Sequence, residues 1–132
     1  MNGVGIVLVS HSAQVAESVA QLARALAAGG AGALVAPAGG RPDGGLGTSA
    51  ELVLAAAASV DRGAGVALLA DLGSAVLTVK ALLEDGDLPP DSRLVDAPFL
   101  EGAVAAVVAA STGAPLEAVA VAATEAYGYR KR

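Results

Sequence analysis

The stretch from Val4 to Ser12, VGIVLVSHS, constrains the fold of this chain more than any other part of the sequence. It is apolar through Val9 and then changes to Ser10, His11 and Ser12. Directly afterwards, apolar residues recur at helical spacing, at Val15, Val19, Leu22 and Leu26. A short apolar run followed by a period of about 3.6 residues is typical of a buried parallel strand that turns into a helix. We therefore expect His11 in the strand-to-helix turn, at the carboxyl edge of a sheet, where open α/β sheets bind their ligands.

Strand-like and helix-like segments continue to alternate along the chain. The patterns predict strands over about Gly5–Val9, Ala33–Ala36, Val66–Ala70 and Ser92–Val95. They predict helices over about Ala13–Ala28, Ser49–Val60 and Phe99–Ala110, one after Asp71 with a face at Val76, Val79 and Leu83, and a last one from Pro115 to Gly128. Such alternation implies parallel strands joined by crossover helices that cover both faces of the sheet. We predict one domain over residues 1–132, with a small doubly wound, mostly parallel α/β fold.

Glycine and proline residues set several of the predicted boundaries. Gly29-Gly30 is expected to end the first helix, and Pro37 to end the second strand. Pro98 fits the first position of the helix that follows it. Between Ala38 and Thr48 lies the most glycine-rich loop, AGGRPDGGLGT, and either Thr48 or Ser49 is expected to cap the next helix.

Composition narrows the classes of function. The 132 residues are enough to bury a core, and since 55% are apolar but only 2% aromatic, that core should consist of small aliphatic side chains. A net charge of −5 disfavours nucleic acid and anionic membranes as partners. With no cysteine, one histidine and no carboxylate cluster of recognisable spacing, we predict no metal site. No apolar stretch approaches the roughly 20 residues of a membrane span and no secretory signal opens the chain, so we expect a cytoplasmic protein.

His11 is the only histidine, so any imidazole chemistry must take place there. A lone histidine is often structural or incidental. The predicted turn, however, places this one beside the first amides of a helix, and these amides and the helix dipole favour an anion. A histidine next to an anion-binding site can act as a nucleophile toward phosphorus.

Asp71 follows the third predicted strand, so it should emerge at the same sheet edge as His11. A carboxylate that accepts a hydrogen bond from Nδ1–H leaves Nε2 with the free lone pair, as in catalytic triads. The alternative is that Asp71 caps the helix that starts near Gly73. The two roles compete for the same oxygens.

Two further helix starts offer groups to a phosphoryl oxygen. Thr48 and Ser49 stand at the end of the glycine-rich loop, and Gly73 and Ser74 supply a cluster of amides after Asp71. The alternative for the loop is a flexible surface segment. Because the loop matches neither G-x-x-x-x-G-K-[ST] nor G-x-G-x-x-G, it lacks a nucleotide fingerprint, and we expect no cofactor.

Four motifs occur in the order of a known family. They are GIVLVSHSAQVAESVAQL at Gly5–Leu22, GTS at Gly47–Ser49, DLGSA at Asp71–Ala75 and DAPFLEGA at Asp96–Ala103. Together they resemble the mannose-type enzyme IIA domain of the phosphoenolpyruvate-dependent phosphotransferase system. They are more similar still to the phosphotransfer subunit of the phosphoenolpyruvate-dependent dihydroxyacetone kinase. The resemblance extends from Gly5 to about Ala123.

The resemblance implies a phosphohistidine carrier. His11 would accept a phosphoryl group from the histidine-containing phosphocarrier protein, a separate protein, and pass it to ADP on the nucleotide-binding subunit of the kinase. Asp71 would be the residue beside this nucleophile. A phosphate surround would be formed by Ser12, Thr48, Ser49, Gly73 and Ser74. The family's fold is a parallel sheet with flanking helices, usually in a dimer.

Three other functions stay open at this point. A sugar-transport enzyme IIA would share the histidine and the aspartate but pass its phosphoryl group to a IIB transporter domain. A receiver-like signalling module would be phosphorylated on Asp71, but it would need an acidic pair where Ser10-His11-Ser12 stands. A non-catalytic binding module would take up no phosphate at all.

Overall fold

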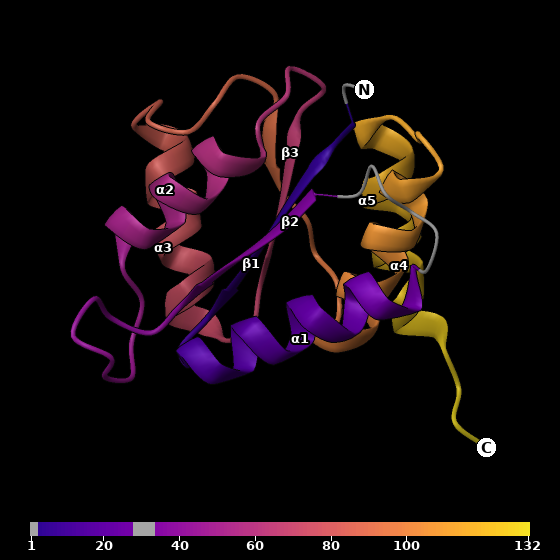
Figure 1. Cartoon of the computed structure of the whole chain (residues 1–132), viewed down its shortest axis with the longest axis horizontal. Helices are drawn as coiled ribbons and strands as arrows, with labels where there is room; N and C mark the ends of the chain where they lie inside the picture. Colours follow the sequence, from indigo (N-terminus) through magenta and orange to yellow (C-terminus); the bar gives the residue numbers. More distant parts are fainter. Residues whose placement is uncertain (1–2, 28–33) are drawn as a thin grey trace.

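The computed structural model describes residues 3–27 and 34–132, which contain a sheet of four parallel strands between two layers of helices (Figure 1). The strands are β1 (Gly5–Ser10), β2 (Leu34–Gly39), β3 (Val66–Ala70) and β4 (Ser92–Leu94). Their order in the sheet is β2-β1-β3-β4. The chain therefore winds from β1 to one side and then crosses to the other, so the direction of winding reverses between β1 and β3. The predicted doubly wound parallel α/β fold is confirmed.

Helices cover both faces of this sheet. They are α1 (Ala13–Leu26), α2 (Ala50–Val60), α3 (Gly73–Glu84), α4 (Phe99–Ser111), α5 (Leu116–Glu125) and the short 3₁₀ helix η1 (Ala126–Gly128). In Figure 1, α2 and α3 lie on one side of the sheet, and α1, α4 and α5 lie on the other. Each layer encloses its own apolar core against the strands.

The central strand β1 explains why the first apolar run is continuous. All six of its residues are buried, because helices cover it on both sides. Ile6 and Leu8 belong to the core under α1, α4 and α5, whereas Val7 and Val9 belong to the core under α2 and α3. This is the alternation of side chains that an extended strand imposes.

The helices pack with small side chains, as the composition predicted. Ala20 and Ala23 on α1 and Ala103 and Ala106 on α4 are fully buried against the sheet. At Gly102, a β-carbon would lie 2.7 Å from the Cβ of Ala97, so even one added methyl group would force the start of α4 away. The core is therefore formed by close approach of backbones rather than by large rings.

The prediction that Pro37 ends the second strand is wrong. β2 continues through Pro37 to Gly39, and Pro37 pairs with Leu8 of β1. A central strand has a neighbour on each side and uses its N–H groups toward both, whereas proline has no N–H to donate. β2, however, is an edge strand with a neighbour on one side only. There, the missing donor faces away from the neighbouring strand.

Other boundaries shift by one or two residues. α1 ends at Leu26, and the expected stop at Gly29-Gly30 lies outside the described residues, as does the expected strand start at Ala33. β4 ends at Leu94 rather than at Val95. Pro98 is the N-cap of α4 rather than its first residue. Such differences are within the usual uncertainty of helix and strand ends.

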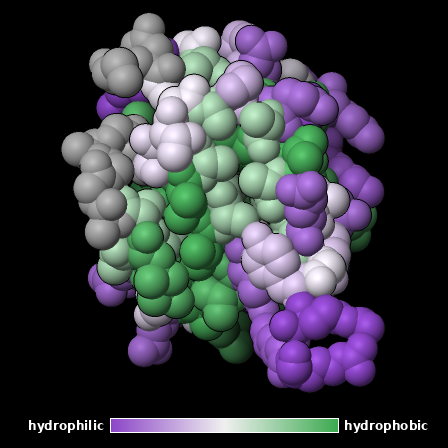
Figure 2. Space-filling model, turned by 90° about the vertical axis from the view of Figure 1, so that its right-hand side faces the viewer, coloured by the Kyte–Doolittle hydropathy of each residue, from purple (hydrophilic) through white to green (hydrophobic). Residues whose placement is uncertain are grey.

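An apolar surface lies between α1 and α4, on the face shown in Figure 2. It consists of Leu22, Leu26, Leu100, Val104 and Val108. Leu22, Leu26 and Leu100 are each more than two-fifths exposed. Contiguous exposed apolar residues of this kind are typical of contact surfaces.

Within residues 3–27 and 34–132, none of the helices has the length and apolar character that crossing a bilayer requires.

Candidate active site

The carboxyl ends of β1 and β3 bring Ser10, His11 and Asp71 together. The two strands are neighbours in register, with Val9 opposite Ala70, so the residues that follow them meet at one edge of the sheet. The amide of Asp71 donates to the carbonyl of Val9 at 3.0 Å, which fixes this junction. The site lies where the winding of the sheet reverses, the position at which open α/β sheets bind ligands.

His11 and Asp71 form a directly hydrogen-bonded pair. Nδ1 of the ring lies 2.9 Å from Oδ1 of Asp71, and the backbone amide of His11 donates to Oδ2 at 3.1 Å. An ionised carboxylate can only accept, so Nδ1 carries the proton and the neutral ring keeps its lone pair on Nε2. The side chain of His11 is 25% exposed, which leaves the outer part of the ring open to a partner.

Ser74 lies at the other nitrogen of the ring. Its hydroxyl contacts Nε2 of His11, from the first turn of α3. Because Nε2 has the lone pair, the hydroxyl is the donor in this contact. The N-cap of α3 is Leu72, and no side chain caps the helix. The first amides of α3 are therefore available near Nε2 for an anion.

Asp71 is not the N-cap of α3, so the capping alternative is not supported. Leu72 occupies that position, and the amide of Leu72 donates to Oδ1 of Asp71 at 2.6 Å. Burial, the largest single influence, raises the pKa of Asp71. Hydrogen bonds from the His11 ring, the Ser10 hydroxyl and the amides of His11 and Leu72 outweigh it and hold this pKa below its ordinary value. The carboxylate is therefore ionised at neutral pH.

This depressed pKa predicts a pH dependence of stability. A carboxyl whose folded-state pKa lies below its unfolded value stabilises the fold above the unfolded pKa, and this contribution is lost as pH falls through the folded pKa. We expect the free energy of unfolding to decrease below about pH 4, and to decrease less steeply in Asp71→Asn. Urea unfolding between pH 2 and about pH 7 measures both slopes. Asp87→Asn, which removes an exposed carboxylate after α3, is the control for charge alone. Equal slopes in the parent and Asp71→Asn would contradict the prediction.

The glycine-rich loop contacts the main chain of the histidine turn. The amide of Gly40 donates to the carbonyl of Ser10, and the amide of Gly47 donates to the carbonyl of His11, both at 3.0 Å. At Gly39 a β-carbon would lie 2.4 Å from the carbonyl oxygen of Ser12, so only glycine permits this approach. The loop therefore supports the histidine turn through its backbone.

The remaining predicted phosphate-site residues lie at helix starts. The side chain of Ser12 caps α1 by accepting from the amide of Val15 at 3.2 Å, and Ser49, rather than Thr48, caps α2 through the amide of Leu52 at 3.2 Å. Among the hydrogen bonds of residues 3–27 and 34–132, none joins Thr48 or Ser49 to the ring of His11. The structure thus brings His11, Asp71 and Ser74 into direct contact, and it places Gly73 beside Ser74 as the first residue of α3.

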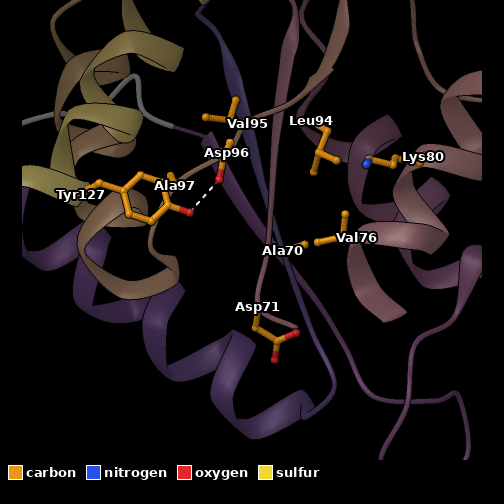
Figure 3. Close-up of a pocket in the computed structure, with 9 residues that line it drawn as sticks. All are labelled: Ala70, Asp71, Val76, Lys80, Leu94, Val95, Asp96, Ala97 and Tyr127. Atoms are coloured by element: carbon orange, nitrogen blue, oxygen red, sulfur yellow. Dashed lines mark hydrogen bonds between the residues drawn. The ribbon is translucent and has the colours of Figure 1, made fainter. Parts of the chain in front are cut away.

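A cavity of about 470 Å³ adjoins this site between β3, β4, α3 and η1 (Figure 3). Asp71 lies at one end of it, and Lys80, Asp96 and Tyr127 also line it. The hydroxyl of Tyr127 donates to Oδ1 of Asp96 at 2.6 Å, and this hydrogen bond raises the pKa of Tyr127. No sequence pattern predicted a role at this site for these three residues. In the part of the chain that the structure describes, no group of three histidine, cysteine or acidic residues could hold a metal ion.

The family model for the PTS system fructose IIA component, EIIA-man, matches residues 5–120. The chain belongs to the EIIA-man family. Its sequence is also 35% identical, over 119 residues, to the phosphoryl donor subunit DhaM of the PEP-dependent dihydroxyacetone kinase of Escherichia coli K12. The match covers 88% of this chain but 25% of that relative, so the chain spans about a quarter of its length.

A shorter relative is matched over most of its length. DhaM of the PEP-dependent dihydroxyacetone kinase 2 of Listeria innocua is 31% identical over 118 residues, which cover 88% of this chain and 93% of the relative. The resemblance predicted from the four motifs is confirmed.

Two solved structures are similar to this chain in fold. The crystal structure of EF1359, a protein of unknown function, superposes with a TM-score of 0.81 at 27% identity and covers 98% of this chain and 97% of its own. A sigma-54 interaction domain protein from Enterococcus faecalis superposes with a TM-score of 0.67 at 18% identity, over 97% of this chain and 93% of its own, and shares the fold.

Proposed function

We propose that residues 1–132 form one phosphotransfer domain, the phosphohistidine-carrying donor subunit of a phosphoenolpyruvate-dependent dihydroxyacetone kinase. The observation that carries the proposal is the His11–Asp71 pair, whose 2.9 Å contact at Nδ1 leaves Nε2 as the nucleophile. The position of this pair, beside the uncapped start of α3, supports a site for a phosphoryl dianion. The relatives from Escherichia coli and Listeria innocua are both named phosphoryl donor subunits.

In the proposed reaction, Nε2 of His11 attacks phosphorus in line with the bond to the donor. The new N–P bond forms as the donor's N–P bond breaks, and the bonding electron pair returns to the histidine of the phosphocarrier protein. The proton on Nδ1 stays in place, and the positive charge that develops on the ring is balanced by Asp71. Phosphoryl transfer of this kind needs positioning and charge stabilisation above all, which a small domain can supply.

Ser74 would have one contact before phosphoryl transfer and another after it. Its hydroxyl occupies the lone pair of Nε2 in the unphosphorylated site, so it must rotate away as the phosphoryl group arrives. From the first turn of α3 it can then donate to a phosphoryl oxygen, next to the amides of Gly73 and its neighbours. Ser12, Thr48 and Ser49 would complete the surround from the other two helix starts.

The proposed partners follow from the same carrier role. The histidine-containing phosphocarrier protein is the donor, and the ADP-loaded kinase subunit is the acceptor. The apolar surface formed by Leu22, Leu26, Leu100, Val104 and Val108 supports a homodimer. The net charge of −5 disfavours nucleic acid and anionic membranes as partners. The proposed location, where the donor and the acceptor would be met, is the cytoplasm.

A second candidate is a sugar-transport enzyme IIA that passes its phosphoryl group to a IIB transporter domain. The description of the matching family model, PTS system fructose IIA component, favours it. The chemistry at His11 would be the same in both cases. The two candidates differ only in the acceptor.

The experiment is a two-step transfer. The protein is incubated with the phosphocarrier system and labelled phosphoenolpyruvate, then isolated and offered either ADP-loaded kinase subunit or a IIB domain. We expect an acid-labile, alkali-stable label that the kinase subunit removes. Removal by the IIB domain alone would establish the transport alternative. An alkali-labile label would indicate an acyl phosphate on Asp71, and no uptake at all would indicate a binding module.

A further inference from the structure

Ser10 is a buried polar residue next to the proposed nucleophile. It ends β1, and it is only 1% exposed. Its hydroxyl lies 2.8 Å from Oδ2 of Asp71, and the backbone amide of Ser12 lies 3.1 Å from the same hydroxyl oxygen. The hydroxyl of Ser10 therefore has two hydrogen-bond partners, the amide of Ser12 in the turn after β1 and the carboxylate of Asp71 after β3.

The direction of both hydrogen bonds follows from the chemistry of the groups. A backbone N–H can only donate, so the amide of Ser12 occupies a lone pair of the Ser10 oxygen. An ionised carboxylate can only accept, so the single hydroxyl proton of Ser10 points at Asp71. The hydroxyl is therefore not free to rotate, and it anchors Oδ2 on the β1 side.

The two oxygens of Asp71 have separate partners. Oδ2 accepts from the Ser10 hydroxyl and from the amide of His11, whereas Oδ1 accepts from the amide of Leu72 and from Nδ1 of the ring. Rotation of the carboxyl group would exchange these contacts. Of the groups that oppose this rotation, the Ser10 hydroxyl is the one that a side-chain substitution can remove without touching the imidazole.

We propose that Ser10 is a positioning residue for phosphoryl transfer at His11. Its hydroxyl fixes the Asp71 carboxylate so that Oδ1 faces Nδ1, and this keeps the Nε2 lone pair directed toward the incoming phosphoryl group. The part that concerns transfer rests on the proposed function, whereas the part that concerns the ring tautomer does not. A purely structural role, in which Ser10 only satisfies the Ser12 amide, predicts a loss of stability with an unchanged tautomer.

The tautomer is tested by ¹⁵N NMR of the imidazole. Since His11 is the only histidine, the ring region of the spectrum contains one residue. At a pH where the ring is neutral, we expect one dominant form, with the proton on Nδ1, in the parent protein. Ser10→Ala should show a mixture of the two neutral forms, and Ser10→Thr, which keeps the hydroxyl, should restore the parent spectrum. A parent-like spectrum in Ser10→Ala would overturn the proposal.

The transfer measurement uses folded protein only, with the rate expressed per folded molecule. We expect Ser10→Ala to lower kcat about 10- to 100-fold, the range that a misplacement near 1 Å produces, with KM for the phosphocarrier protein unchanged. Ser10→Cys replaces the hydroxyl with a thiol, a weak hydrogen-bond donor of similar size, and should also lower kcat. This variant takes the place of Ser10→Ala if the alanine variant does not fold. Ser92→Ala is the matched control. It removes a serine hydroxyl that donates to the carbonyl of Pro89 at the amino end of β4, away from the site.

The two measurements separate this inference from the proposed function. A parent protein that takes up no phosphoryl group would contradict the carrier role, and the NMR result would still decide whether Ser10 sets the tautomer. Slow transfer in Ser10→Ala and Ser10→Cys, with parent rates in Ser10→Thr and Ser92→Ala, supports the positioning role. A parent rate in both Ser10→Ala and Ser10→Cys overturns it.

Discussion

Replacing His11 with alanine is expected to abolish phosphoryl uptake while leaving the fold intact. No other imidazole exists in the chain, so the variant has no group to take over the N–P bond. The ring lies in a surface turn with its side chain 25% exposed, and its removal leaves the two cores untouched. The measurement is label from phosphoenolpyruvate retained on the protein, together with circular dichroism and the thermal midpoint of unfolding.

The matched control for this variant is Arg62→Ala. Arg62 is exposed in the turn before β3, at the sheet edge opposite the site, so its loss should leave uptake unchanged. Label that stays on His11→Ala at the parent level would show that another residue carries the phosphoryl group. The stability of that label in alkali would then identify the linkage, because an acyl phosphate on Asp71 is hydrolysed there.

Asp71→Ala is expected to slow transfer by up to about 10⁴-fold without abolishing it, because loss of the orienting carboxylate costs about that much in catalytic triads. Without Oδ1, either nitrogen of the ring can carry the proton, so the fraction with a lone pair on Nε2 decreases. The charge that balances the developing imidazolium is lost as well. Residual activity remains because Nε2 and the first amides of α3 are still present. Rapid-quench measurement of the first turnover gives the rate.

Asp87→Ala controls for the loss of one negative charge elsewhere on this acidic protein. It should transfer at the parent rate. An unchanged rate in Asp71→Ala would remove this carboxylate from the mechanism. It would leave the pair as a structural contact between β1 and β3.

The placement of His11 and Asp71 at the same edge of the sheet could be predicted from local patterns because it depends on one topological rule. Two apolar runs, each followed by a helical period, indicate parallel strands, and parallel strands end at the same edge of a sheet. The rule does not say which strands are neighbours, so the direct contact between the two residues could not be predicted from it. That order, β2-β1-β3-β4, is a tertiary property, and it explains the error at Pro37, since a proline ends a central strand but not this edge strand.

The support around the histidine was harder to predict, because it runs through buried or backbone atoms. Ser10 is the first polar residue after the apolar run, and only its contact with a carboxylate 61 positions away shows what its hydroxyl does. Gly40 and Gly47 hold the turn through their amides, which any residue but proline would carry, so no side-chain pattern marks them. The hydroxyl of Ser49 is used by the helix that it begins.

The pairing of β1 with β3 also affects when the site comes into existence during synthesis. His11, the proposed nucleophile, emerges from the ribosome 60 positions ahead of Asp71, and α3, the proposed site for the phosphoryl oxygens, emerges later still. A nascent chain that stops short of β3 has the imidazole without its orienting acid. Under the proposed function, efficient loading with phosphate requires that β1 and β3 have paired, so a half-made chain competes poorly for the donor.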